Sequence, residues 1–221
     1  GYRIAYVAGR TLRIVNGDGS GDRRYARTRS AGAPAWRPGA GHVLAYVDAR
    51  ARVHVADVDA GRTLWRSGPL PGAHGLAWAP DGSRLVVLAA RRAVVLDGDG
   101  ARLATLPLPA GTRAAAAAWS PGGEVALVLR DPVANRSELV SLGPAGGRRR
   151  ILFTAPGTLR PPAWSPDGRM LLLAWTDANE WLFFAPGRRH RPVEIVEDVA
   201  AQFAPGGSRP RFPSSVEWAP R

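Results

Sequence analysis

A short phrase built on tryptophan and proline recurs five times along this chain and constrains its fold more than any other feature. Its clearest copy is Trp-Ala-Pro-Asp-Gly at 78–82, which leads into the apolar run 84–88. The other copies begin at Trp36, Trp119, Trp164 and Trp218. Proline presets the backbone angle of a turn, and glycine supplies the positive φ that such a turn often needs. Each copy therefore predicts a strand that ends near tryptophan, a tight turn and, where the chain continues, a second strand.

The spacing of the copies indicates the fold. Successive tryptophans are 41 to 54 residues apart, and self-similarity at roughly 40–45 residues is typical of a β-propeller with one four-stranded blade per repeat. The end of the chain, 218–221, followed by its beginning, 1–7, reproduces the phrase and the strand after it. We therefore predict an all-β, five-bladed β-propeller of four-stranded antiparallel blades, closed by pairing of the C-terminal strand with the N-terminal blade.

The predicted blades divide the chain, 1–221, as a single propeller domain. Blade 1 takes 1–32 together with 215–221, and the other blades take 33–72, 73–111, 112–157 and 158–214. The alanine run 114–119 is predicted to be a strand because it ends in the repeated phrase, although alanine favours helix. A short helix is expected at about 198–203.

Composition limits the classes of function. The chain has no cysteine, which excludes disulfides and thiolate metal sites. All 30 basic residues are arginine, and the net charge is +12. This excess favours anionic partners, although part of it fits translation from a GC-rich genome. No apolar run approaches the roughly 18 residues of a membrane span. The chain opens directly on a predicted strand, so either the protein is cytosolic or a leader or anchor has been removed.

Catalytic and metal motifs are lacking in the sequence. It has no Gly-x-Ser-x-Gly, no His-Glu-x-x-His and no phosphate loop. Among the predicted inner strands only Glu217 offers a carboxylate, whereas a glycosidase needs two. The Asp-Gly stretches at 16–22 and 97–100 resemble calcium loops but lack the bidentate acid, so they are interpreted as turns. We expect no enzyme activity, no metal and no cofactor.

Arginine placement suggests a binding face. In a propeller, the loops from strand two to strand three and from strand four to the next blade share one face, and here they are rich in arginine. Besides Arg10 and Arg130, the predicted binding residues are Arg29, Arg50, Arg52, His74, Arg91, Arg92, Arg113, Arg136, Arg160, Arg209 and Arg211. They face few acids: Asp48, Asp131, Asp177 and Glu180.

Two interpretations of this face stay open. One is a solvated surface in an arginine-biased chain; the other is a cationic face that docks an acidic protein or an anionic envelope polymer. Further arginines at 148–150 and 188–191 fall on the opposite face, which argues against a single binding surface. Aromatic residues do not interleave with the arginines, which disfavours nucleic acid.

The phrase Trp-Ser-Pro-Asp-Gly at 164–168 and its copies resemble the repeats of TolB-like propellers, also called WD40-like or PD40 repeats. The resemblance implies a bacterial cell-envelope protein that binds other proteins, or the gating propeller of a peptidase. We therefore expect a monomeric, non-catalytic interaction domain in the periplasm or at the cell surface. The alternatives are a module that binds carbohydrate or an anionic small ligand in its central channel, and a regulatory propeller from a larger enzyme.

Overall fold

The computed structural model describes residues 1–28, 32–143, 149–185, 187, 191–203, 211–213 and 218. The chain divides into two compact units, Gly1–Pro107 (unit 1) and Leu108–Arg221 (unit 2). The described strands form five sheets, and every strand pairs antiparallel with its neighbours in the chain. The predicted all-β class is confirmed.

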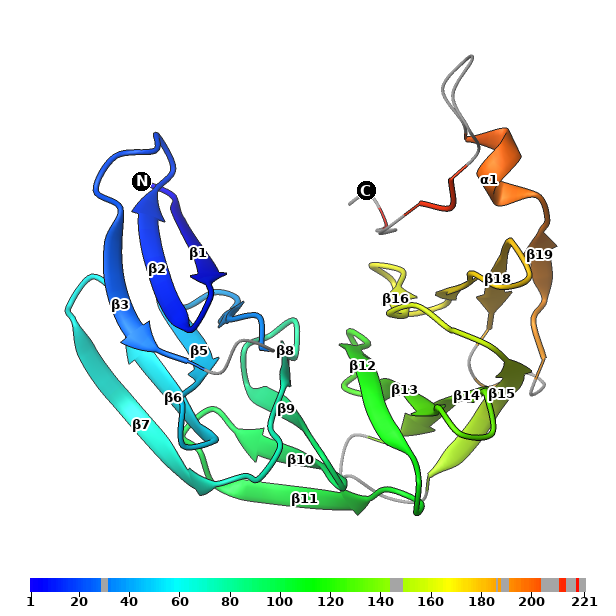
Figure 1. Cartoon of the computed structure of the whole chain (residues 1–221), viewed down its shortest axis with the longest axis horizontal. Helices are drawn as coiled ribbons and strands as arrows, with labels where there is room; N and C mark the ends of the chain where they lie inside the picture. The colour runs from blue at the N-terminus through cyan, green and yellow to red at the C-terminus, as the bar shows by residue number, and fades with distance from the viewer. Residues whose placement is uncertain are drawn as a thin grey trace. The chain divides into compact units, whose positions relative to one another are not determined.

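Unit 1 contains three sheets (Figure 1). The first has three described strands, β1 (Arg3–Ala8), β2 (Thr11–Asn16) and β3 (Arg23–Arg27). The second is β4 (Ala35–Trp36), β5 (Val43–Val47), β6 (Arg52–Asp57) and β7 (Arg62–Pro69). The third is β8 (Gly75–Trp78), β9 (Arg84–Ala89), β10 (Arg92–Asp97) and β11 (Arg102–Pro107).

The middle sheet of unit 1 is buried on both faces, which explains why its second strand is a continuous apolar run. Alternate residues of β5 point to opposite faces. Val43, Ala45 and Val47 join a core shared with the third sheet, which contributes Leu85 and Val87 among others. The residues between them join a core with the first sheet; this second core includes Leu12, Ile14, Leu44 and Tyr46. A strand covered on both faces has no polar side, so the alternation of a half-exposed strand is lost.

Unit 2 contains two sheets and one short helix. The first sheet is β12 (Arg113–Trp119), β13 (Val125–Asp131), β14 (Arg136–Leu142) and β15 (Arg150–Pro156). The second is β16 (Ala163–Trp164), β17 (Leu171–Trp175), β18 (Glu180–Phe184) and β19 (Glu194–Val196), followed by α1 (Val199–Gln202). The alanine run forms β12 because it pairs along β13 and buries Ala114 and Ala116, so tertiary packing overrides helix propensity.

Three of the repeated tryptophans donate a hydrogen bond to the preceding copy of the repeat. The indole N–H of Trp78 donates to the carbonyl of Ala35 at 3.2 Å, and Trp164 donates in the same way to Ala118 at 3.2 Å. In each case the tryptophan at the end of one sheet's first strand reaches the first strand of the sheet before it. Trp218 repeats the contact, donating to Ala163 at 2.9 Å.

Arg37 replaces the small residue that follows tryptophan in the other copies of the phrase, and its side chain joins two sheets of unit 1. Its Nε donates to the carbonyl of Gly82 at 2.8 Å, and Nη1 donates to that of Gly98 at 3.3 Å. The guanidinium lies 5.2 Å from the ring centroid of Trp78. Trp65 adds a hydrogen bond from its indole to the Gly98 carbonyl at 2.7 Å.

The predicted inner strand of blade 1, 215–221, lies outside the described residues except for Trp218. In the described part of the chain, β1 is therefore an edge of its sheet. Closure of the ring stays a prediction.

Candidate interaction surface

In unit 1 five of the predicted binding residues lie on three adjoining connections: Arg50, Arg52, His74, Arg91 and Arg92. Arg10 lies in the β1–β2 turn. The connection 70–74 between β7 and β8 contacts the hairpins on either side of it: the N–H of Leu70 donates to the carbonyl of Ala51 at 2.7 Å. Gly72 has a φ of +73°, and a Cβ on it would lie 2.4 Å from the Cβ of Ala90. The β5–β6 hairpin, this connection and the β9–β10 hairpin are therefore packed together. We call them the hairpin surface of unit 1.

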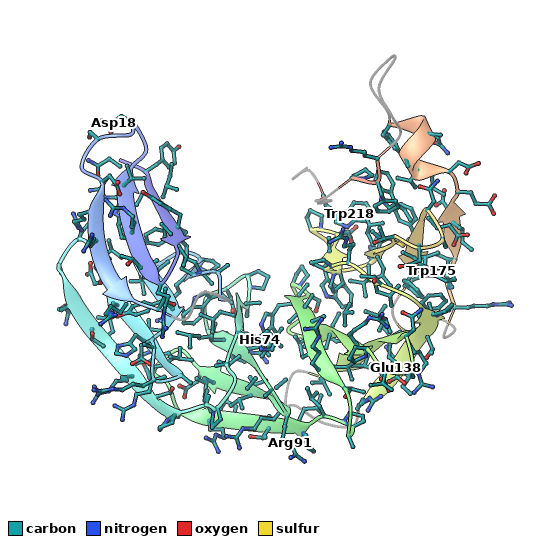
Figure 2. The ribbon with its side chains drawn as sticks, in the orientation of Figure 1. Asp18, His74, Arg91, Glu138, Trp175 and Trp218 are labelled. Atoms are coloured by element: carbon teal, nitrogen blue, oxygen red, sulfur yellow. The ribbon has the colours of Figure 1, made fainter. Side chains whose placement is uncertain are left out.

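The arginines of this surface differ in how available they are. Arg50 and Arg91 are exposed, whereas Arg52 and Arg92 are half-buried. The Nε of Arg52 is buried without a hydrogen-bond acceptor. Among the described residues, no carboxylate oxygen lies within 4.0 Å of a guanidinium nitrogen of these four arginines. Figure 2 labels Arg91 at the turn between β9 and β10. Arg50 and Arg91 are thus the most available cations of this surface.

Asp48 is the acidic residue closest in sequence to Arg50 and Arg52, and its carboxylate takes part in hydrogen bonds within its own hairpin. Its Oδ1 accepts the backbone N–H groups of Arg50 at 2.8 Å and Arg52 at 2.9 Å, and its Oδ2 lies 2.9 Å from Nε2 of His54. Burial by itself would raise the pKa of the Asp48 carboxyl, but these hydrogen bonds outweigh it and leave the pKa below its ordinary value. Asp48 therefore shapes the turn and does not pair with a guanidinium.

His74, predicted as a possible ligand contact, is part of the connection's own hydrogen bonding. Its Nδ1 donates to the carbonyl of Gly72 at 2.9 Å, and its backbone N–H donates to Leu88 at 2.9 Å. The side chain is half-buried just before β8 (Figure 2). The geometry assigns His74 a part in holding the connection.

Unit 2 repeats the arrangement. The N–H of Gly157, after β15, donates to the carbonyl of Asn135 in the β13–β14 hairpin at 2.7 Å. The N–H of Thr158 donates to Oδ2 of Asp177, in the β17–β18 hairpin, at 2.7 Å. Oδ1 of Asp131 accepts two backbone N–H groups of its own turn, at 3.0 and 2.9 Å. We call these two hairpins and the connection 157–162 the hairpin surface of unit 2. As on unit 1, the carboxylates of this surface accept hydrogen bonds from backbone N–H groups of turns and connections.

Several arginines lie at or beside the hairpin surface of unit 2. Arg113 and Arg130 are direct cross-strand partners, and such like charges repel unless an anion is nearby. The guanidinium of Arg130 donates to the Asp131 carbonyl at 3.0 Å and to Oδ1 of Asn135 at 2.6 Å, which fixes its position. Arg136 lies 3.4 Å from a carboxylate oxygen of Glu138, so it is partly neutralised.

Of the remaining predicted residues, some lie outside the described part of the chain. Arg160 and Arg211 are exposed, and Arg29 and Arg209 lie outside the described residues. Of the arginines predicted on the opposite face, Arg149 pairs with Glu138, and Arg150 lies 3.5 Å from Glu124. Those two arginines therefore have acidic partners, unlike Arg50, Arg91 and Arg160 within the described chain.

The Asp-Gly stretches at 16–22 and 97–100, which resemble calcium loops in sequence, form turns. Oδ1 of Asp97 accepts the N–H groups of Asp99 at 3.0 Å and Ala101 at 2.8 Å, and Oδ1 of Asp18 accepts the N–H of Ser20 at 2.9 Å. No group of three metal-ligating side chains comes together in the described ranges. Within them there is also no helix long and apolar enough to cross a membrane.

Two hollows were not predicted from the sequence. One, of about 520 Å³, runs along β1 and is lined by Ala5, Tyr6 and Val7 and by Gly32, Ala33 and Pro34. The other, of about 650 Å³, lies in unit 2 between the β12–β13 and β16–β17 turns; its lining includes Glu124, Arg150, Trp164 and Asp167. Sequence gave no signal for the second because its residues come from segments far apart in the chain.

Comparison with known proteins shows the fold. No family model and no curated protein matches the chain. A chain of the crystal structure of the mitotic checkpoint complex superposes with a TM-score of 0.68 at 17% identity, over 90% of this chain and 63% of that one. The calcium-binding protein regucalcin of Agrobacterium tumefaciens str. C58 gives 0.53 at 16% identity, over 75% of this chain and 58% of its own.

These similarities place the chain in the β-propeller class with a WD40-like fold. The chain spans less than two thirds of the length of both solved chains. At this level of identity the likeness concerns the fold alone, and function has to be argued from the surfaces.

Proposed function

We propose that this chain is a non-catalytic interaction scaffold whose hairpin surfaces dock an acidic protein or an anionic polymer. The observation that carries the proposal is the state of the charges on these surfaces. Arg50, Arg91 and Arg160 are exposed without a carboxylate partner in the described chain. The carboxylates beside them accept backbone N–H groups of the turns. The positive charge is therefore left for a partner.

Guanidinium groups suit this role because they stay charged and bind carboxylates or phosphates through two parallel hydrogen bonds. The hairpins that carry them are held by the buried sheets and by the connections 70–74 and 157–162, so each surface is preorganised. One structural neighbour belongs to a multiprotein assembly, the mitotic checkpoint complex, which fits a scaffold role. The likeness of the repeats to TolB-like propellers supports a place in a bacterial envelope, outside the cytoplasm.

Ring closure belongs to the same proposal. The hollow along β1 lies where an inner strand would pair, and Trp218 already makes with Ala163 the contact that Trp164 makes with Ala118. A tail strand in that position would cover the edge of β1, and open strand edges are an aggregation hazard.

The docking proposal is tested with a fluorescein-labelled polyglutamate peptide of about 20 residues, long enough to span several phosphate- or carboxylate-sized contacts. The double variant Arg50→Glu, Arg91→Glu reverses two exposed charges of the unit 1 surface. The matched variant Arg62→Glu, Arg102→Glu makes the same change of net charge on the outer strands β7 and β11, where both arginines are exposed. Fluorescence anisotropy then gives the dissociation constant of each protein.

We expect the hairpin variant to bind at least about tenfold more weakly and the outer-strand variant to change by less than about twofold, because direct pairing outweighs screened long-range attraction. Raising the salt from about 0.05 to 0.5 M should weaken wild-type binding, since screening shortens the reach of the charges. Equal losses in the two variants would mean that net charge alone drives binding. That result would refute a specific docking surface.

A further inference from the structure

The segment 197–203, which follows β19 and contains α1 (Figure 1), lies against the β17–β18 hairpin of unit 2. Two hydrogen bonds connect it to Asn179 in that hairpin. The N–H of Val199 donates to the Asn179 carbonyl at 3.1 Å, and the N–H of Ala200 donates to Oδ1 of the same residue at 2.8 Å. The side chain of Val199 is fully buried. We call 197–203 the strap.

The strap covers Trp181 but leaves its N–H without an acceptor. The ring centroids of Phe203 and Trp181 are 4.8 Å apart, near the hairpin end of β18. Nε1 of Trp181 is buried and has no hydrogen-bond partner in the described chain. Phe203 is itself 53% exposed. Asp198, just before α1, has a φ of +53°, in the left-handed region that costs free energy for residues other than glycine. A cover with these defects is easier to displace than a well-packed element.

A cation lies in line with Trp181 across the same sheet. The N–H of Arg160 donates to the carbonyl of Ala174 at 2.9 Å, beside the bridge between Leu159 and Trp175. Ala174 is in turn the cross-strand partner of Trp181. Cross-strand partners share a face, and strands about 4.8 Å apart place the two ends of this row roughly 10 Å from each other. An α-helix with its side chains is about 10–12 Å across, so one helix can contact both ends.

The chain's own sequence at this place indicates which ligand the row accepts. Three exposed acids, Glu194, Glu197 and Asp198, come within five positions. Two apolar residues four positions apart follow them, Val199 and Phe203, and this spacing places side chains on one face of a helix. An acidic segment with a short apolar face is therefore the kind of ligand that already lies here.

We propose that the row of Arg160, Ala174 and Trp181 binds an acidic helical segment of a partner protein, and that the strap is the occupant this segment displaces. An apolar residue of the partner takes the place of Phe203 on the Trp181 ring, and an oxygen of the partner accepts the indole N–H. A carboxylate of the partner pairs with the exposed guanidinium of Arg160. The inference rests on the proposed docking function for the acidity of the partner.

The test uses a fluorescein-labelled peptide with the sequence of 194–203 and a scrambled peptide of the same composition and charge. Both are titrated with the full chain, and fluorescence anisotropy gives the dissociation constants. The strap variant, Val199→Ala, Phe203→Ala, removes the two apolar contacts of the strap. The matched control, Val193→Ala, Ile195→Ala, removes two half-exposed apolar side chains just before the strap.

A site covered by the strap is available only in the fraction of molecules whose strap has left it, and the apparent affinity falls by that fraction. We therefore expect the strap variant to bind the peptide at least about tenfold more tightly than wild type, and the control to stay within about twofold of wild type. The scrambled peptide should bind the strap variant at least about tenfold more weakly than the native sequence does. Trp181→Phe keeps a ring but removes the donor, so in the strap variant it should weaken binding several-fold.

The inference is overturned if wild type and the strap variant bind the peptide equally, if the two peptides bind equally, or if neither peptide binds. Its failure differs from that of the docking proposal. Specific polyglutamate binding without peptide binding would overturn this inference alone. Sequence-specific peptide binding to the strap variant without specific polyglutamate binding would overturn the general docking surface and leave the site at Trp181.

Discussion

Arg37 provides the sharpest test of how the sheets of unit 1 are held together. Replacing it with alanine removes two hydrogen bonds from a cation to backbone carbonyls, at 2.8 and 3.3 Å, and the contact with the Trp78 ring. Hydrogen bonds that involve a charged group contribute about 1.5–3 kcal/mol each, and a cation–π contact contributes about 0.5–1 kcal/mol where it is exposed.

The size of the loss follows from the surroundings of the three contacts. Arg37 is half-buried, and its second hydrogen bond is long. The Gly98 carbonyl keeps the indole N–H of Trp65 after the substitution, so it is not left without a donor. The low ends of the ranges therefore apply, and together they give about 3.5 kcal/mol. In a chain of 221 residues this lowers the melting temperature by roughly 7–14 °C.

The assay is thermal and urea unfolding of Arg37→Ala and Arg37→Lys, with hydrogen exchange to locate the effect. Lysine keeps the charge, but a single ammonium cannot reproduce a planar fork that reaches two carbonyls, so it should recover less than half of the loss. Faster exchange should appear in β8–β11. Arg62→Ala, an exposed control on β7, should stay within about 0.5 kcal/mol of wild type. An unchanged midpoint for Arg37→Ala, or full rescue by lysine, would refute the reasoning.

The remaining predictions concern closure and acid stability. If the tail pairs with β1 in the register of Leu76 with Val87, Val216 lies opposite Tyr6, and the double variant Val216→Cys, Tyr6→Cys should form an intramolecular disulfide in this cysteine-free chain. Exclusively intermolecular disulfides on a non-reducing gel would contradict closure. Because the pKa of Asp48 is lowered in the folded protein, its charge stabilises the fold above the unfolded pKa of about 3.9, and this stabilisation is lost as the pH falls through the folded value. The stability gap between wild type and Asp48→Asn should thus be large at pH of about 6 and small at pH of about 3, as measured by urea midpoints; an equal gap at both would count against it.

The repeated phrase was enough to predict where most strands lie, because turn chemistry and buried apolar runs are local properties. It also placed β12 correctly, where propensity alone would have failed. The short helix α1 was expected at about 198–203 independently of the phrase. Arg37 could be seen only as a departure from the phrase, because the carbonyls it bridges lie 45 and 61 residues further along the chain. The hollow beside Trp164 could not be predicted for the same reason, because turns of two different sheets line it.

Counting charges along the sequence does not reveal which groups the acids bind. Asp48, Asp131 and Asp177 stand against the arginines in a sequence count, yet each uses its oxygens on backbone N–H groups of turns or connections. A carboxylate engaged in this way still carries its charge, but it offers fewer free lone pairs to a guanidinium. The hairpin surfaces are therefore more open to an external anion than the count suggests.

Genomic bias alone could have supplied arginine to both the outer strands and the hairpins, so abundance does not distinguish the two interpretations. The physical demands at the two places differ. On β7 and β11 a charge of either sign protects a sheet edge from pairing with another chain, so glutamate should serve as well as Arg62 or Arg102. On the hairpins, docking an anion requires a positive charge, so glutamate at both Arg50 and Arg91 should weaken it at least about tenfold. If the excess positive charge serves binding, the outer strands should therefore accept a charge of either sign, whereas the hairpins should require a positive one.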